Sequence, residues 1–105
     1  MSDEGLLGAF EEQVLLAVAR TGDEAFGMAV RRELESVTGR DVTVGAVYAT
    51  LDRLEAKGLA GSRRARTAGA RRVFHLTRAG ARALAEAKAT RERLWRGIRI
   101  DALLA

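Results

Sequence analysis

Residues 43–76 read TVGAVYATLDRLEAKGLAGSRRARTAGARRVFHL, and this stretch decides the fold. Thr43 stands where an N-cap is expected, ahead of a helix that we predict to run to Lys57. Four apolar residues then recur at steps of three, four and three, and so define one buried helical face: Val44, Val47, Leu51 and Leu54. Gly58 ends this helix, which is the third along the chain.

Two segments of strand length follow, at Leu59–Arg64 and Arg71–Leu76. The small residues of the loop at 65–70 separate them. Val73 and Phe74 have the β-branched and aromatic character typical of strands. This pattern predicts a β-hairpin.

Upstream, apolar residues at helical spacing predict one helix over Ala9–Arg20 and another over Gly27–Thr38, with a break at 21–24 and a stop at Gly39. Downstream, Thr77 caps a helix from Arg78 to at least Arg96. The tail from 97 to 105 either continues this helix or packs back on it.

The predicted fold class is therefore mainly α with a small β-hairpin, a winged helix-turn-helix domain with a C-terminal dimerisation helix. We expect residues 1–76 to form the DNA-binding domain. Residues 77–105 form the dimerisation helix and tail, and the two parts make one compact unit, as the length of 105 residues suggests.

Charge is strongly segregated along the chain. Residues 1–56 hold five basic and eleven acidic side chains, a net charge of −6, whereas residues 57–105 hold thirteen basic and three acidic ones, a net charge of +10. Such an asymmetry predicts a polyanionic partner for the second half.

Several classes of function are excluded by the residue types present. The sequence has no cysteine, which removes disulfides and thiolate sites and fits a reducing cytoplasm. Asp3 and Glu4 do not suit a signal peptide, and no apolar run is long enough to span a bilayer. His75 is the only histidine, and no metal, cofactor or catalytic constellation accompanies it. We therefore predict a cytoplasmic protein that is not an enzyme, needs no cofactor and has no membrane partner.

The third helix is the candidate recognition helix. Its first two turns contain no carboxylate, and its small residues allow a close approach to DNA. The predicted DNA contacts on it are Thr43, Val44, Gly45, Tyr48, Ala49 and Arg53. An alternative for Tyr48 is that it packs at the edge of the core.

The hairpin carries five arginines and no acid: Arg63, Arg64, Arg66, Arg71 and Arg72. Guanidinium groups suit phosphate contacts and the narrow minor groove. A solvated run of charge is the alternative interpretation, but clustering beside a recognition helix favours DNA contact.

The last helix is rich in alanine, which lets two helices approach closely. With the first helix it predicts a two-fold interface, and a homodimer would read a pseudo-palindromic operator with half-sites about 34 Å apart. The predicted interface residues are Phe10, Val14, Leu84, Ala87, Arg91, Leu94, Trp95 and Ile98.

Taken in order, these segments resemble the short branch of the PadR family of winged-helix regulators. The resemblance is carried by residues 7–17, by Ala25-Phe26-Gly27 with residues 31–34, by residues 44–55 leading to Gly58-Leu59, and by residues 69–80, which include a Leu-Thr-x-x-Gly start of the last helix. It implies a homodimeric repressor built by the first and last helices. For some relatives it also implies release from DNA by a small-molecule effector.

Two departures from the family pattern concern this effector site. Relatives often carry tyrosines in the second wing strand, where this chain has Val73 and Phe74. They also often carry a tryptophan where this chain has Arg91, and Trp95 lies one turn later. We expect Arg91 and Trp95 to be the effector contacts if an effector binds, with packing as the alternative role for Trp95.

A winged-helix adaptor for protein partners is the alternative function. The arginine-rich wing and the acid-free start of the third helix speak against it. RNA recognition is disfavoured because stacking aromatic residues make up only 5% of the chain.

Overall fold

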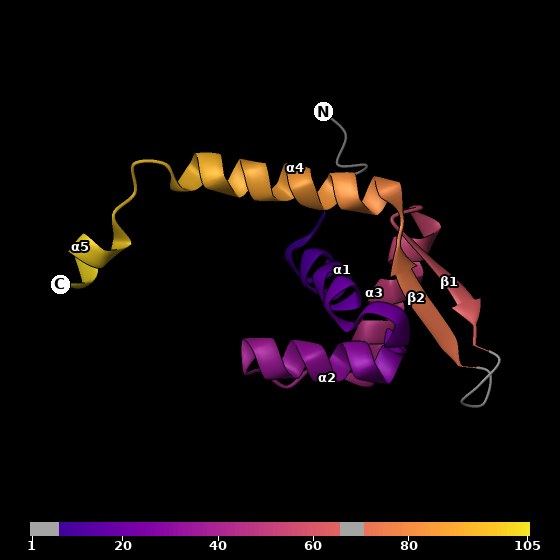
Figure 1. The fold of residues 1–105 in the computed structure, drawn as a ribbon. Helices are drawn as coiled ribbons and strands as arrows, with labels where there is room; N and C mark the ends of the chain where they lie inside the picture. The colour runs from indigo at the N-terminus through magenta and orange to yellow at the C-terminus, as the bar shows by residue number, and fades with distance from the viewer. Residues whose placement is uncertain (1–6, 66–70) are drawn as a thin grey trace.

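The computed structural model describes residues 7–65 and 71–105. Figure 1 shows three helices gathered into a body, a hairpin on one side, and a long helix that crosses the body and extends beyond it. The elements are α1 (Ala9–Thr21), the 3-10 turn η1 (Gly22–Glu24), α2 (Gly27–Thr38), α3 (Val44–Ala56), β1 (Ala60–Arg64), β2 (Arg72–Leu76), α4 (Arg78–Trp95) and α5 (Ile100–Leu104). This order confirms the predicted winged helix-turn-helix with a C-terminal helix.

Local signals set the ends of the helices. The hydroxyl of Thr43 accepts a hydrogen bond from the Ala46 N–H at 3.1 Å, so it caps α3 as predicted. Thr77 caps α4 in the same way, through the Gly80 N–H at 3.0 Å. Gly39 ends α2 with a φ of 71°, a left-handed conformation that glycine adopts without strain.

The core lies where α1, α2, α3 and the hairpin meet. It contains apolar residues of α1, α2, α3 and both strands, and the largest of its fully buried side chains are Phe74, Leu15, Leu51, Leu54, Val14, Val18, Val30 and Val47. Val44, which the sequence assigned to the same face as Val47, is 38% exposed instead, because it stands at the first position of α3, beyond the packed turn.

The hairpin is antiparallel, with Ala60 opposite Leu76 and Arg64 opposite Arg72. A bridge between Phe26 and Val73, which the sequence did not reveal, joins it to the segment before α2. The Phe74 N–H also donates to the Ala25 carbonyl at 3.0 Å. These contacts fix the wing against the helical body.

Gly80 sets the position of α4. It is buried, and a Cβ at this position would lie 2.0 Å from the carbonyl oxygen of Leu59. Only a residue without a side chain lets the first turn of α4 approach the backbone that leads into the hairpin.

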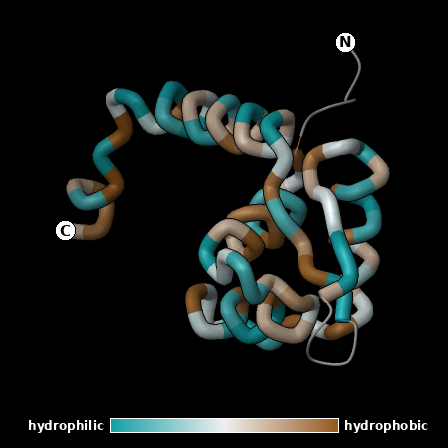
Figure 2. Tube along the Cα trace, turned by 45° about the vertical axis from the view of Figure 1, so that its right-hand side comes forward, coloured by the Kyte–Doolittle hydropathy of each residue, from teal (hydrophilic) through white to brown (hydrophobic). Residues whose placement is uncertain are grey.

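The end of α4 differs from the prediction. The helix stops at Trp95 rather than at Arg96 or beyond, and Gly97 adopts a φ of 82° that turns the chain before α5. The tail therefore neither continues α4 nor packs back on it. Both views place α5 away from the body, and Figure 2 shows apolar stretches in this segment. Within the described residues, no helix has the length and apolarity needed to cross a membrane.

Candidate nucleic-acid interface

The first half of α3 presents the surface that the sequence predicted. Thr43, Val44, Gly45 and Ala49 are exposed, and the first turn carries no acidic residue. A Cβ added to Gly45 would meet nothing within 4 Å, so the space beside the first turn of α3 is open. A nucleic-acid backbone can approach this helix end without steric or electrostatic obstruction by its own side chains.

Tyr48 lies half-buried at the edge of this surface. Its ring covers Gly27 at the start of α2 so closely that a Cβ on Gly27 would lie 2.2 Å from the ring carbon Cζ. The Tyr48 ring therefore packs against the start of α2, which is the alternative role that the sequence leaves open for this residue.

Tyr48 also lines a concave region that joins α2, α3 and the wing, which we call the basic hollow. Its volume is about 210 Å³, and its lining residues are Phe26, Met28, Tyr48, Arg64, Arg71 and Arg72. The Arg71 guanidinium lies 4.9 Å from the centre of the Phe26 ring. The first turn of α2, which begins here, holds no acidic residue, and its N-cap makes no side-chain hydrogen bond. The chemistry of the basic hollow therefore suits an anion.

Arg72 has a second role that the sequence did not reveal. Its guanidinium donates to Glu55 at 2.7 Å and to Asp52 at 3.2 Å, and both acids belong to the last turns of α3. The Ser62 hydroxyl donates to the same Glu55 carboxylate at 2.8 Å. Glu55 thus holds both strands of the wing. The contact joins residues 17 positions apart on different elements, so no local pattern announces it.

The surroundings of Arg72 keep it charged. Burial alone would lower the pKa of its guanidinium, but the hydrogen bonds to Asp52 and Glu55, together with their charges, raise that pKa above its ordinary value. The guanidinium also lies 4.7 Å from the centre of the Phe74 ring. Arg72 therefore ties the wing to α3, which is a different task from a direct DNA contact.

The Arg53 side chain contacts α1 and lies away from the N-terminal end of α3. Its Nε lies 3.7 Å from the Glu11 carboxylate, and its guanidinium also donates to Thr50 at 3.1 Å. Glu11 is buried and accepts hydrogen bonds from Lys57 at 2.8 Å and from the Gly8 N–H at 2.9 Å. Burial raises the pKa of the Glu11 carboxyl, but the hydrogen bonds and positive charges around it outweigh this and lower the pKa below its ordinary 4.5. Glu11 thus anchors the far end of α3 to α1.

The remaining arginines of the wing occupy two different settings. Arg63 and Arg64 are exposed on β1, and Arg71 is exposed just before β2. Arg66 lies outside the described residues. The structure therefore groups Arg64, Arg71 and Arg72 around the basic hollow, whereas Arg63, next to Arg64 on β1, is not among the lining residues.

The residues predicted for a dimer interface differ widely in burial. Val14 is fully buried in the core of its own chain, so it is not accessible to a second copy. Phe10 and Leu84 are half-buried and pack against that core. Leu94, Trp95 and Ile98 are exposed at the end of α4 and beyond it.

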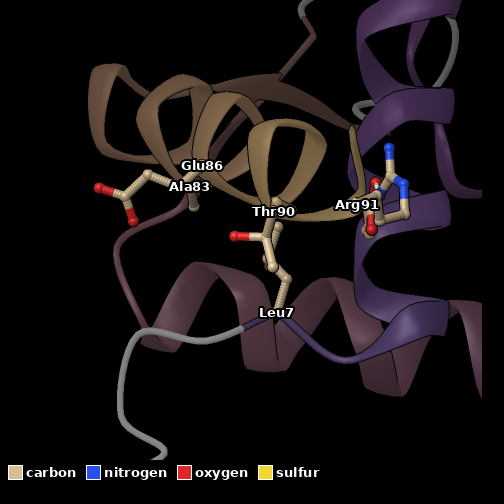
Figure 3. Close-up of a pocket in the computed structure, with 7 residues that line it drawn as sticks. Leu7, Ala83, Glu86, Thr90 and Arg91 are labelled. Carbon is tan, nitrogen blue, oxygen red and sulfur yellow. Dashed lines mark hydrogen bonds and ion pairs between the residues drawn. The ribbon is translucent and has the colours of Figure 1, made fainter. Parts of the chain in front are cut away.

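Ala87 and Arg91 line a second concavity, of about 290 Å³. Figure 3 shows α4 contributing Ala83, Glu86, Thr90 and Arg91, with Leu7 entering from the segment before α1. Arg91 forms an ion pair with Glu12 of the same chain. Trp95, the other predicted effector contact, is not among the lining residues of this concavity.

Residues 7–65 and 71–105 hold no group of three or more His, Cys, Asp or Glu side chains that could bind a metal ion.

Comparison with known proteins agrees with this architecture. The family described as Transcriptional regulator PadR-like family matches residues 15–86. Among solved structures, RosR from H. salinarum superposes with a TM-score of 0.71 at 23% identity, covering 93% of this chain and 90% of that chain. A RosR complex, RosR-SG, gives a TM-score of 0.74 at 25% identity, covering 98% and 93%.

A third solved structure, F93 from STIV, is a winged-helix DNA-binding protein. It matches with a TM-score of 0.70 at 17% identity and covers 84% of this chain and 92% of that chain. No curated protein sequence matches the chain.

Proposed function

Since the chain belongs to the PadR-like family of transcriptional regulators, we propose that it is a homodimeric repressor that binds a pseudo-palindromic operator in double-stranded DNA. The observation that carries the proposal is the basic hollow, which lies beside the acid-free start of α3. This combination offers a surface for the major groove and, next to it, a cradle for phosphate.

In the proposed complex, α3 enters the major groove with its N-terminal half. Thr43 and the N–H groups of the first turn face a phosphate, while Val44 and Ala49 face base edges, where a thymine methyl suits them. Few side chains on this face form the two-pronged hydrogen bonds that distinguish guanine or adenine. Phosphate contacts and DNA shape therefore supply much of the affinity.

The basic hollow receives a phosphate of the strand that flanks the groove. Arg64 and Arg71 supply the positive charge, and the uncapped start of α2 supplies N–H donors. Arg63 extends this surface along β1 toward the adjacent minor groove. Arg72 keeps the wing at the angle that this arrangement needs.

Dimerisation and effector binding complete the proposal. Two copies are needed to present two α3 helices to a two-fold operator, and α1 with α4 forms the interface. The concavity beside Arg91 is of a size that suits a small molecule. A ligand that breaks the Arg91–Glu12 pair would change how α4 lies on α1, and with it the spacing of the two α3 helices. In this proposal, the repressor acts in the cytoplasm.

Fluorescence anisotropy of a labelled duplex tests this function. The duplex comes from the region upstream of the protein's own gene, unrelated DNA is the comparison, and the titration is repeated at several salt concentrations. We expect preferential binding to the upstream duplex that weakens steeply with salt, since each neutralised phosphate releases counterions.

The variant Arg64→Ala with Arg71→Ala should weaken binding to both duplexes, whereas Arg82→Ala, an exposed arginine on α4, should not. Weak binding to every duplex that is insensitive to salt would contradict the proposal. It would instead favour an adaptor that uses the same fold to bind a partner protein.

A further inference from the structure

Residues 39–43 join α2 to α3, and we call them the α2–α3 turn. Four of these five residues are exposed, whereas Val42 is half-buried and packs against the core. A concavity of about 340 Å³ lies beside the turn, and Phe10 of α1, Val42 and Ala46 are among its lining residues. Apolar packing is therefore incomplete on this side, and polar contacts carry more of the task of holding the turn in place.

An ion pair on α2 holds the backbone of Val42 at both of its polar groups. The Arg31 Nε–H donates to the Val42 carbonyl at 2.7 Å, and the Val42 N–H donates to the Glu35 carboxylate at 2.9 Å. Arg31 and Glu35 lie one helical turn apart, and their charged groups approach to 3.6 Å. The three residues form a closed ring of polar contacts, which we call the Val42 clamp. Both side chains are partly shielded, at 31% and 28% exposed, so water competes less with these contacts than at an open surface.

The clamp acts directly before the start of α3. Val42 adjoins Thr43, whose hydroxyl caps α3, and Val44 is the first residue of the helix. In the proposed complex, Val44 and Ala49 make apolar contacts with base edges. A gap of about 0.5–1 Å already forfeits about a quarter to a half of the energy of such contacts. The position of this helix end therefore decides how well α3 distinguishes one base sequence from another.

We propose that Arg31 and Glu35 are positioning residues for DNA recognition. By holding the Val42 backbone, they set the N-terminal half of α3 at the depth at which it distinguishes the operator from unrelated DNA. Neither side chain needs to touch DNA for this role. Phosphate contacts of the wing do not depend on the clamp, so its loss lowers preference more than overall DNA binding. This inference rests on the proposed operator binding and adds the residues that fix α3 for it.

Anisotropy titrations of the full chain with the upstream duplex and with unrelated DNA test the clamp. Glu35→Ala removes the acceptor for the Val42 N–H and should lower the ratio of the two binding constants about tenfold or more, the equivalent of one lost hydrogen bond to a charged group. Most of this loss should fall on the upstream duplex. Glu33→Ala is the matched control and should keep the ratio, because Glu33 lies on the same helix, is also 28% exposed, and pairs with Arg20 instead of the turn.

Two conservative variants separate positioning from charge. Glu35→Gln keeps a side-chain oxygen that can accept from the Val42 N–H, so it should recover most of the preference. Arg31→Lys keeps the positive charge but lacks the guanidinium that reaches both the Val42 carbonyl and Glu35, so it should lose preference as Glu35→Ala does. The double variant should be no worse than Glu35→Ala alone, because the two residues act as one unit.

Hydrogen exchange followed by NMR reports on the clamp in the absence of DNA. The Val42 amide should exchange about tenfold faster or more in Glu35→Ala than in the parent, because it loses its acceptor. The amide of Leu15, which is fully buried in α1, should keep its rate and so show that the core is intact. An unchanged rate at Val42 would overturn the clamp.

The outcomes separate this inference from the proposed function. If the parent prefers the upstream duplex and Glu35→Ala keeps the same ratio, the clamp is overturned and the repressor stands. An equal loss of binding to both duplexes would also overturn it, since it would indicate general damage to the DNA-binding surface. A parent without any preference for the upstream duplex would refute the proposed function and this inference with it.

Discussion

The contrast between Arg63 and Arg72 gives the sharpest prediction about DNA binding. Both arginines are on the wing, and by charge alone they are equivalent. Arg63 is exposed on β1, whereas the Arg72 guanidinium already contacts Glu55 at 2.7 Å and Asp52 at 3.2 Å. We therefore predict that Arg63→Ala removes a phosphate contact and that Arg72→Ala loosens the attachment of the wing.

The expected magnitudes follow from counterion release. The logarithm of the binding constant falls linearly with the logarithm of the salt concentration, with a slope of about 0.9 for each phosphate that is contacted. A homodimer loses two contacts in Arg63→Ala, so its slope should become shallower by about 1.8. Arg72→Ala should weaken binding through wing position, with a clearly smaller change in slope.

The assay is the anisotropy titration of one operator duplex at four or more salt concentrations, for the parent and for each variant. Arg82→Ala on α4 is the matched control, since it removes an exposed arginine at a distance from the basic hollow. An equal loss of slope in Arg63→Ala and Arg72→Ala would refute the reasoning. It would mean that Arg72 leaves its carboxylate partners and contacts phosphate.

Two further predictions concern stability, measured by urea unfolding at fixed protomer concentration. Glu11→Gln should lower the free energy of unfolding by about 1–3 kcal/mol at neutral pH, because the buried contact to Lys57 loses its charge. The pKa of Glu11 is lowered in the folded state, so its contribution to stability is present above the ordinary 4.5 and is lost as pH falls through the lowered value. The difference in unfolding free energy between parent and variant should therefore shrink over that acid range. A difference that stays constant with pH would contradict this role for Glu11. Gly80→Ala should lower the free energy of unfolding by about 1–3 kcal/mol, because the added Cβ would lie 2.0 Å from the Leu59 carbonyl oxygen. Gly45→Ala has open space around it and should stabilise α3 by up to about 1 kcal/mol. Equal effects of the two substitutions would show that the contact at Gly80 is not restrictive.

Much of the site was predictable because its parts are local. The acid-free start of α3 and the cap at Thr43 lie within one short segment, and the arginines of the wing lie within ten residues. Their roles as DNA contacts remain predictions. The bridge from Phe26 to Val73 and the basic hollow were not predictable, because they join residues almost fifty positions apart.

Val14 and Arg91 show that periodicity in the sequence does not decide which surface a residue contacts. An apolar residue on α1 can face the core or a second copy, and the spacing is the same in both cases; packing against α2 and α3 decided for the core at Val14. Arg91 was expected at an interface or a ligand, and the approach of α1 supplied Glu12 as its partner within the same chain.

The sequence by itself determined the order of the elements, their caps and the stripes that form the core, because hydrophobic periodicity and capping act between residues three or four apart. Tertiary structure alone decided which of the equivalent wing arginines holds the wing in place and which apolar residues of α1 face the core. These outcomes depend on which carboxylates and which surfaces the fold brings close together, and the pattern of residues along the chain does not give those distances.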